Sequence, residues 1–143
     1  MAPIELLSDF VLQGCSAGAL STYAWTDQVM DYVRMRNPAI NYWALPDSAF
    51  YVDYKSLRTG KYDYKLQMQA LYSVANEETA PFPQEDCVKN YGNESYVCFV
   101  TEYMFPFIRS PLFIIQSGYD SFQIPNILQS KCSHLSNCTA DQL

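Results

Sequence analysis

Residues 14–18 read Gly-Cys-Ser-Ala-Gly and match the pattern G-x-S-x-G. In hydrolases this pattern presents a serine hydroxyl on a sharp turn between a strand and a helix, where it can attack a carbonyl carbon. Ser16 is therefore the candidate nucleophile, and the backbone N–H of Ala17 is the candidate donor to the negative oxygen of a tetrahedral intermediate. The pattern fixes only three positions and occurs by chance in roughly one chain in twenty of this length. The prediction therefore depends on whether a strand precedes it and a helix follows it.

A serine nucleophile needs a base, and the base needs a carboxylate that orients it. In hydrolases with this motif the acid follows the serine along the chain, and the histidine follows the acid. Asp120 suits the role of the acid because it comes after the most strand-like segment of the chain, on a turn that contains Gly118. Asp47 also follows a predicted strand and competes for the role.

The sequence contains a single histidine, His134. Its position after Asp120 permits it to be the base. However, residues 130–138 contain no strand-like run that would carry a catalytic histidine, so we expect a surface histidine in a loop between cysteines. His134 as the base remains the alternative.

Strand-like and helix-like segments alternate along the chain. An apolar run leads directly into the serine motif, and a long segment without proline follows it until Asn37-Pro38 ends the helical pattern. Predicted strands are residues 8–13, 40–45 and 112–116; predicted helices are residues 17–36, 62–74 and 124–128; residues 77–94, rich in Pro, Glu and Asn, are expected to form an irregular surface loop.

This alternation predicts the α/β class, with a mostly parallel sheet and flanking helices in one domain over residues 1–143. Ligands of such sheets bind at the carboxyl ends of the strands. Ser16 and Asp120 each follow a predicted strand end, so we expect them at the same edge of the sheet.

The composition favours a folded protein whose partner is not nucleic acid. The 143 residues are 49% hydrophobic and only 17% charged, and the formal net charge is -6. A negative net charge disfavours binding to the phosphate backbone of nucleic acids and to anionic membrane surfaces. No apolar run approaches the roughly 20 residues that cross a bilayer, and residues 1–7 lack the basic region of a signal peptide.

The cysteines and two glycosylation sequons favour the secretory pathway. Two close cysteine pairs suit two local disulfides and leave one thiol over. The alternative is reduced cytosolic thiols with chance sequons. No metal or cofactor site is predicted, because CxxC pairs are absent and one histidine supplies too few ligands. The pairs are Cys87 with Cys98 and Cys132 with Cys138, the remaining thiol is Cys15, and the sequons begin at Asn93 and Asn137.

Four segments, in order, resemble conserved blocks of the pectin acetylesterase and Notum family of serine carboxylesterases. Residues 14–18 resemble its GCSAGG block, residues 45–53 its SDAGFFLD block, and residues 98–99 the start of its CFFPQ block. Residues 111–124, PLFIIQSGYDSFQI, are similar to its PLFILNSAYDSWQI block and are the most specific of the four.

The resemblance implies an α/β-hydrolase fold and a serine esterase mechanism without a cofactor. Ser16 would be the nucleophile, Asp120 the acid, and Asp47 a structural or pocket-edge residue. The substrate would be an acylated ester, such as an acylated polysaccharide or protein. Ala19 and Phe122 depart from the family's glycine and tryptophan, so the pocket shape does not carry over.

In the family, a glycine-rich oxyanion segment lies upstream of the serine and the catalytic histidine lies downstream of the paired cysteines. Both lie outside these 143 residues. We therefore expect the central portion of an esterase, which alone would hydrolyse esters poorly or not at all. The alternative is a non-catalytic remnant that binds a glycan or a protein partner.

Overall fold

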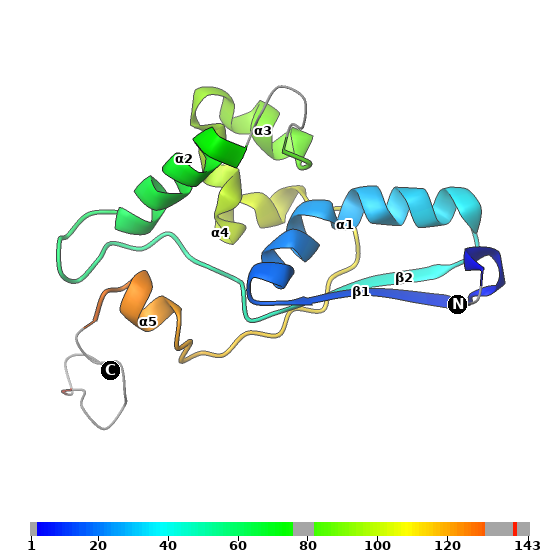
Figure 1. The fold of residues 1–143 in the computed structure, drawn as a ribbon, viewed down its shortest axis with the longest axis horizontal. Coiled ribbons are helices and arrows are strands. Elements are labelled where there is room, and N and C mark those ends of the chain that lie inside the picture. The colour runs from blue at the N-terminus through cyan, green and yellow to red at the C-terminus, as the bar shows by residue number, and fades with distance from the viewer. Residues whose placement is uncertain (1–2, 76–81, 131–138, 140–143) are drawn as a thin grey trace.

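The computed structural model describes residues 3–75, 82–130 and 139. Strand β1 (Asp9–Cys15) and strand β2 (Asn41–Asp47) pair in parallel, in a register that runs from Asp9 opposite Asn41 to Cys15 opposite Asp47. Helix α1 (Ala17–Arg36) connects them (Figure 1). The predicted strand, turn and helix around the serine motif are confirmed. The short 3-10 helix η1 (Ile4–Leu6) precedes β1.

Residues 111–115 lie beside β2 as a third parallel segment, with bridges that pair Ala44 with Leu112 and Asp47 with Ile115. The predicted strand at residues 112–116 is thus in the expected place, but it is not a regular strand. Pro46 of β2 has no N–H, so one hydrogen bond is missing between β2 and residues 111–115, between two bonds that do form. Those flanking bonds are Phe113 N to Ala44 O, 2.9 Å, and Ile115 N to Pro46 O, 3.1 Å.

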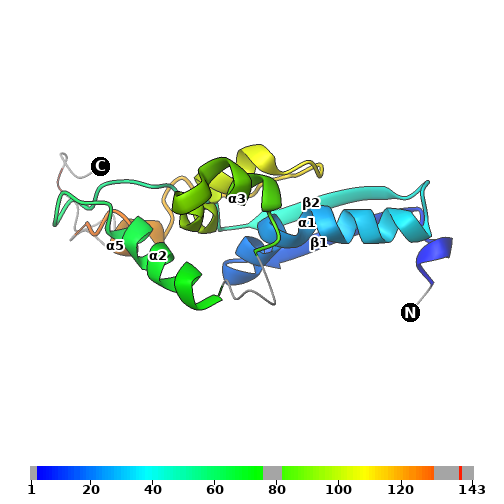
Figure 2. The same cartoon turned by 90° about the horizontal axis from the view of Figure 1, so that it is seen from above.

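Helix α1 covers one face of this sheet (Figures 1 and 2). Met30 of α1 packs there with Tyr42 and Ala44 of β2 in a small buried cluster. The side chains of the opposite face are exposed, as with Trp43 at 43% and Phe113 at 68%. The sheet with its flanking helices confirms the α/β class.

The remaining helices form a second group that packs on the start of α1. Its core contains Cys87, Cys98 and Met104, together with Ala19 and Tyr23 of α1. Among the described residues, no helix is both long enough and apolar enough to span a membrane. The elements are α2 (Asp63–Ala75), α3 (Glu85–Tyr91), the 3-10 helix η2 (Gly92–Phe99), α4 (Thr101–Met104), the 3-10 helix η3 (Phe105–Phe107) and α5 (Gln123–Asn126).

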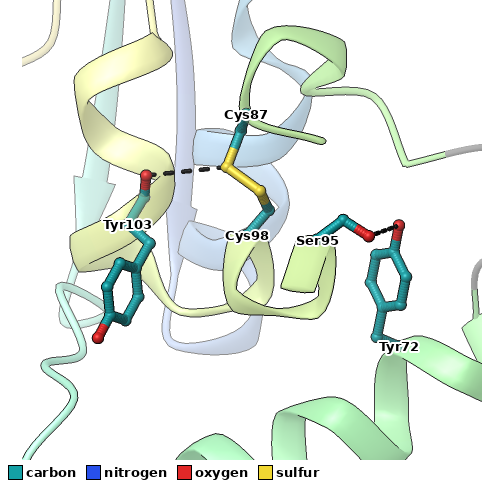
Figure 3. Close-up of a disulfide and its surroundings, with 5 residues drawn as sticks. All are labelled: Tyr72, Cys87, Ser95, Cys98 and Tyr103. Carbon is teal, nitrogen blue, oxygen red and sulfur yellow. Dashed lines mark hydrogen bonds between the residues drawn. A yellow bond between two sulfur atoms is a disulfide. The ribbon is translucent and has the colours of Figure 1, made fainter. Parts of the chain in front are cut away.

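The expectation of an irregular loop over residues 77–94 was wrong for its second half, which is helical in α3 and the start of η2. Glu85 and Asp86 lie in the first turn of α3, where carboxylates interact favourably with the helix dipole. The predicted disulfide between Cys87 and Cys98 joins α3 to η2, beside the carbonyl of Tyr103 (Figure 3). The predicted pair Cys132 and Cys138 lies outside the described residues.

Candidate active site

Ser16 occupies the turn between β1 and α1 and is exposed. Its backbone has φ 54° and ψ -121°, a sparsely populated positive-φ conformation that costs about 1–3 kcal/mol for a residue with a side chain. The turn is held by the Ser16 N–H, which donates to the carbonyl of Asp47 at 2.9 Å, and by the Ser16 carbonyl, which accepts from Ala19 N at 2.9 Å. The hydroxyl is thus presented to solvent on a fixed backbone.

Gly14 permits the close approach of β1 to α1. A Cβ at this position would lie 2.2 Å from the carbonyl oxygen of Gly18 and 2.6 Å from Thr22 Oγ1. A Cβ at Gly18 would meet no atom within 4 Å. The first glycine of the motif is therefore required by packing, whereas the second leaves open space beside the serine.

Three parallel strand ends meet at the edge where Ser16 lies. Ser16 follows β1 and bonds to Asp47, the last residue of β2. Ser48 N then donates to the carbonyl of Ile115 at 2.8 Å, which ties the end of β2 to the segment that leads into Asp120. The structure therefore brings the predicted nucleophile and the predicted acid to one edge of the sheet.

Hydrogen bonds surround the Asp120 carboxylate on both oxygens. Phe122 N and Gln123 N donate to Oδ1 at 2.7 and 3.1 Å. The side-chain amides of Gln116 and Gln123 donate to Oδ2, the latter at 3.4 Å. Partial burial works to raise the pKa of Asp120, but the backbone and side-chain hydrogen bonds outweigh it and lower the pKa. The carboxylate is ionised at neutral pH, as an acid that orients a histidine must be.

Tyr51 is close enough to both predicted residues to be influenced by them. It lies within residues 45–53, which resemble a family block, but no role was predicted for it from the sequence. Burial raises the pKa of its phenol, a hydrogen bond with the Ser16 side chain lowers it, and the charge of Asp120 raises it. The net effect is a raised pKa, so the phenol is neutral at pH 7. The Tyr51 ring is 3% exposed and stacks on Phe122 with centroids 5.0 Å apart.

The other predicted residues take less central positions. The Asp47 carboxylate accepts from its neighbour Ser48 Oγ at 2.7 Å, and the Asp47 carbonyl holds the serine turn. Ala17 begins α1, where backbone N–H groups have no partner within the helix and can serve a ligand. His134 lies outside the described residues. In the described part of the chain, no three His, Cys, Asp or Glu side chains gather in a way that could hold a metal ion.

A family model described as pectinacetylesterase matches residues 5–142. The chain belongs to the pectinacetylesterase family. Pectin acetylesterase 7 of Arabidopsis thaliana is 30% identical over 137 residues, which are 92% of this chain and 32% of the relative. Pectin acetylesterase 11 of the same plant is 29% identical over 146 residues, with 93% and 35% covered. The chain thus spans about a third of the length of these curated relatives.

Solved structures show the fold. Two crystal forms of the Wnt deacylase Notum from Drosophila superpose with a TM-score of 0.64 at 21% sequence identity. The match covers 76% of this chain and 30% and 31% of the Notum chains. The chain therefore has part of an α/β-hydrolase fold, as the family resemblance implied.

Proposed function

We propose that this chain carries the nucleophile and the acid of a serine carboxylic-ester hydrolase that removes acetyl or other acyl groups. Residues 1–143 would form one partial domain of that enzyme. The observation that supports the proposal most is the exposed Ser16, held at a positive φ between a strand and a helix in a pectinacetylesterase chain. Sparsely populated backbone conformations of this kind cluster at functional sites, and a serine nucleophile on a strand-to-helix turn is held in this way.

The reaction would proceed through an acyl-enzyme. Ser16 Oγ attacks the acyl carbonyl carbon while its proton passes to a histidine, and the Ala17 N–H donates to the oxyanion that forms. The intermediate expels the alcohol, which takes the proton from the histidine. Water then attacks the acyl-serine by the same route, releasing the carboxylic acid and restoring Ser16.

Asp120 would orient this histidine and stabilise its positive charge. Following the family resemblance, we assign the base to a histidine beyond these 143 residues, with His134 as the alternative. Without that base, the chain would retain only the small rate advantage of binding and oxyanion stabilisation.

The substrate would be an ester of a polysaccharide or of an acylated protein. Two relatives are named pectin acetylesterases, and a structural neighbour is named a Wnt deacylase. Tyr119 and Phe122, 67% and 42% exposed beside Asp120, offer aromatic surface on which a sugar ring or an acyl chain can pack.

The secretory pathway is the proposed location. The Cys87–Cys98 disulfide supports it, because such bonds persist in oxidising compartments. The sequon at Asn93 also supports it, because this asparagine is exposed in the fold.

Acetate release from acetylated polysaccharide, measured with the longest natural protein that contains residues 1–143, tests the function. We expect activity that Ser16→Ala and Asp120→Asn abolish or greatly reduce and that Asp47→Asn leaves largely intact. His134→Ala separates the two assignments of the base, since unchanged activity removes His134. Ligand binding without ester hydrolysis would instead support the non-catalytic alternative.

A further inference from the structure

Two glutamines bridge Asp120 to the backbone of residues 50–52. Gln116 Oε1 accepts from Phe50 N at 2.8 Å, while Gln116 Nε2 donates to the Asp120 carboxylate. Gln123 Oε1 accepts from Val52 N at 3.2 Å, and Gln123 Nε2 donates to Phe50 O at 3.2 Å and to Asp120 at 3.4 Å. Gln116 thus bonds to the carboxylate through its amide nitrogen and to Phe50 through its amide oxygen. Gln123 bonds to the carboxylate and to the backbone of Phe50 and Val52.

These bonds connect parts of the chain that are 66 to 73 residues apart. Residues 50–52 include Tyr51, whose buried ring stacks on Phe122 and belongs to the same buried cluster as Ala19 of α1. The glutamine pair therefore ties the acid to a segment that shares a buried cluster with the start of α1, the helix that follows the nucleophile. A change in the position of residues 50–52 would move Asp120 with it.

The pair also supplies two of the four donors that surround the carboxylate. An ionised carboxylate has about four acceptor positions, and Asp120 receives four donors. The longest of these bonds, from Gln123 Nε2, has a second acceptor in the Phe50 carbonyl. If an imidazole N–H replaced the Gln123 amide as a donor to Asp120, Gln123 would keep its hydrogen bonds to Phe50 and Val52.

We propose that Gln116 and Gln123 are positioning residues that hold the Asp120 carboxylate in one orientation by bridging it to residues 50–52. Their effect on catalysis rests on the proposed esterase function, whereas the hydrogen bonds of the bridge are independent of it. Neither glutamine was predicted from the sequence to be part of the site.

The test is an NMR titration of the Asp120 carboxyl carbon in the 143-residue chain. Gln116→Glu keeps the acceptor for Phe50 N–H but replaces the amide donor with a like charge, so the titration midpoint of Asp120 should rise. Gln116→Met removes both bonds without adding charge and should raise the midpoint less. Gln69→Glu makes the same charge change on the exposed side of α2 and should leave the midpoint unchanged.

An unchanged midpoint in Gln116→Glu, in a protein whose spectrum shows an intact fold, would overturn the bridge. This variant decides the question even if Gln116→Met fails to fold. In the longest natural protein, Gln116→Glu should lower kcat with little change in KM and shift the acidic limb of the pH profile. A shifted midpoint with an unchanged kcat and pH profile would refute the positioning role. A wild-type protein without esterase activity would refute the proposed function and leave the titration result standing.

Discussion

The backbone N–H of Ser16 donates to the carbonyl oxygen of Asp47 at 2.9 Å, across the ends of two neighbouring strands. Through this bond the serine turn is held by β2 as well as by the first turn of α1. Ser48, which follows β2, donates its N–H to the carbonyl of Ile115 on the segment before Asp120, so the end of β2 holds both the nucleophile turn and the segment that leads to the acid.

Gly14→Ala should destabilise the fold by about 3 kcal/mol or more, because the new Cβ would lie 2.2 Å from a backbone oxygen that cannot move without displacing α1. Gly18→Ala is the matched control. It meets no atom and should change the free energy of unfolding by no more than about 1 kcal/mol. Urea unfolding measures both, and equal effects of the two variants would contradict the packing argument.

Asp120→Asn should reduce the acid sensitivity of the fold. Despite partial burial, hydrogen bonds lower the pKa of Asp120 in the folded state, so its ionisation stabilises the fold above the unfolded-state pKa. That contribution is lost as the pH falls through the folded-state pKa. The stability difference between wild type and Asp120→Asn should therefore shrink as the pH falls from 7 to about 3. A difference that stays constant across urea melts in this range would show that the charge is not stabilised.

Replacing Cys87 and Cys98 together by alanine should cost about 3 kcal/mol, the loop-closure contribution of a bond that spans 11 residues. Both sulfurs lie in the core beside Ala19 and Tyr23 of α1, so the start of the helix that follows Ser16 should loosen as well. Cys15→Ser, at an exposed free thiol, should have little effect on the thermal midpoint. Equal midpoints for wild type and the double variant would contradict this account.

Asn93 should carry an N-linked glycan when the protein passes through a eukaryotic secretory pathway. Ser95→Ala removes the sequon and also the hydrogen bond from Ser95 Oγ to the Tyr72 phenol, 3.0 Å. Tyr72→Phe removes the same bond but keeps the sequon, so it separates the two effects. A mass loss after glycan removal is expected for Tyr72→Phe and not for Ser95→Ala at this site. A secreted wild type without modification at Asn93 would refute the prediction.

Local patterns predicted the elements on which the serine turn depends. Three local features were sufficient to predict β1 and α1: the glycine spacing, the apolar run before it and the proline that follows residue 36. Helix α1 begins and ends at the predicted residues. The irregular form of residues 111–115 could not be predicted locally, because it arises from the missing N–H of Pro46 on the neighbouring strand. Helix α3 was missed because its polar composition resembles that of a loop.

The contacts within the site were harder to predict than its position. Ser16 and Asp120 were identified from motifs and strand ends, which are local features. Gln116 and Gln123 are within four residues of Asp120, but the bonds that make them a bridge go to residues 50–52, which are distant in the sequence. The ring of Tyr51 likewise stacks on the distant Phe122. Their participation follows only from the packing of residues 50–52 against the turn that carries Asp120.

Covalent labelling with a fluorophosphonate, followed by peptide mass spectrometry, tests the central claim most directly. In the longest natural protein that contains residues 1–143, we predict a phosphonylated peptide modified at Ser16, which Ser16→Ala abolishes while the fold is retained. A folded protein that hydrolyses esters yet carries its adduct on another residue, or none at all, would contradict the assignment of Ser16 as the nucleophile.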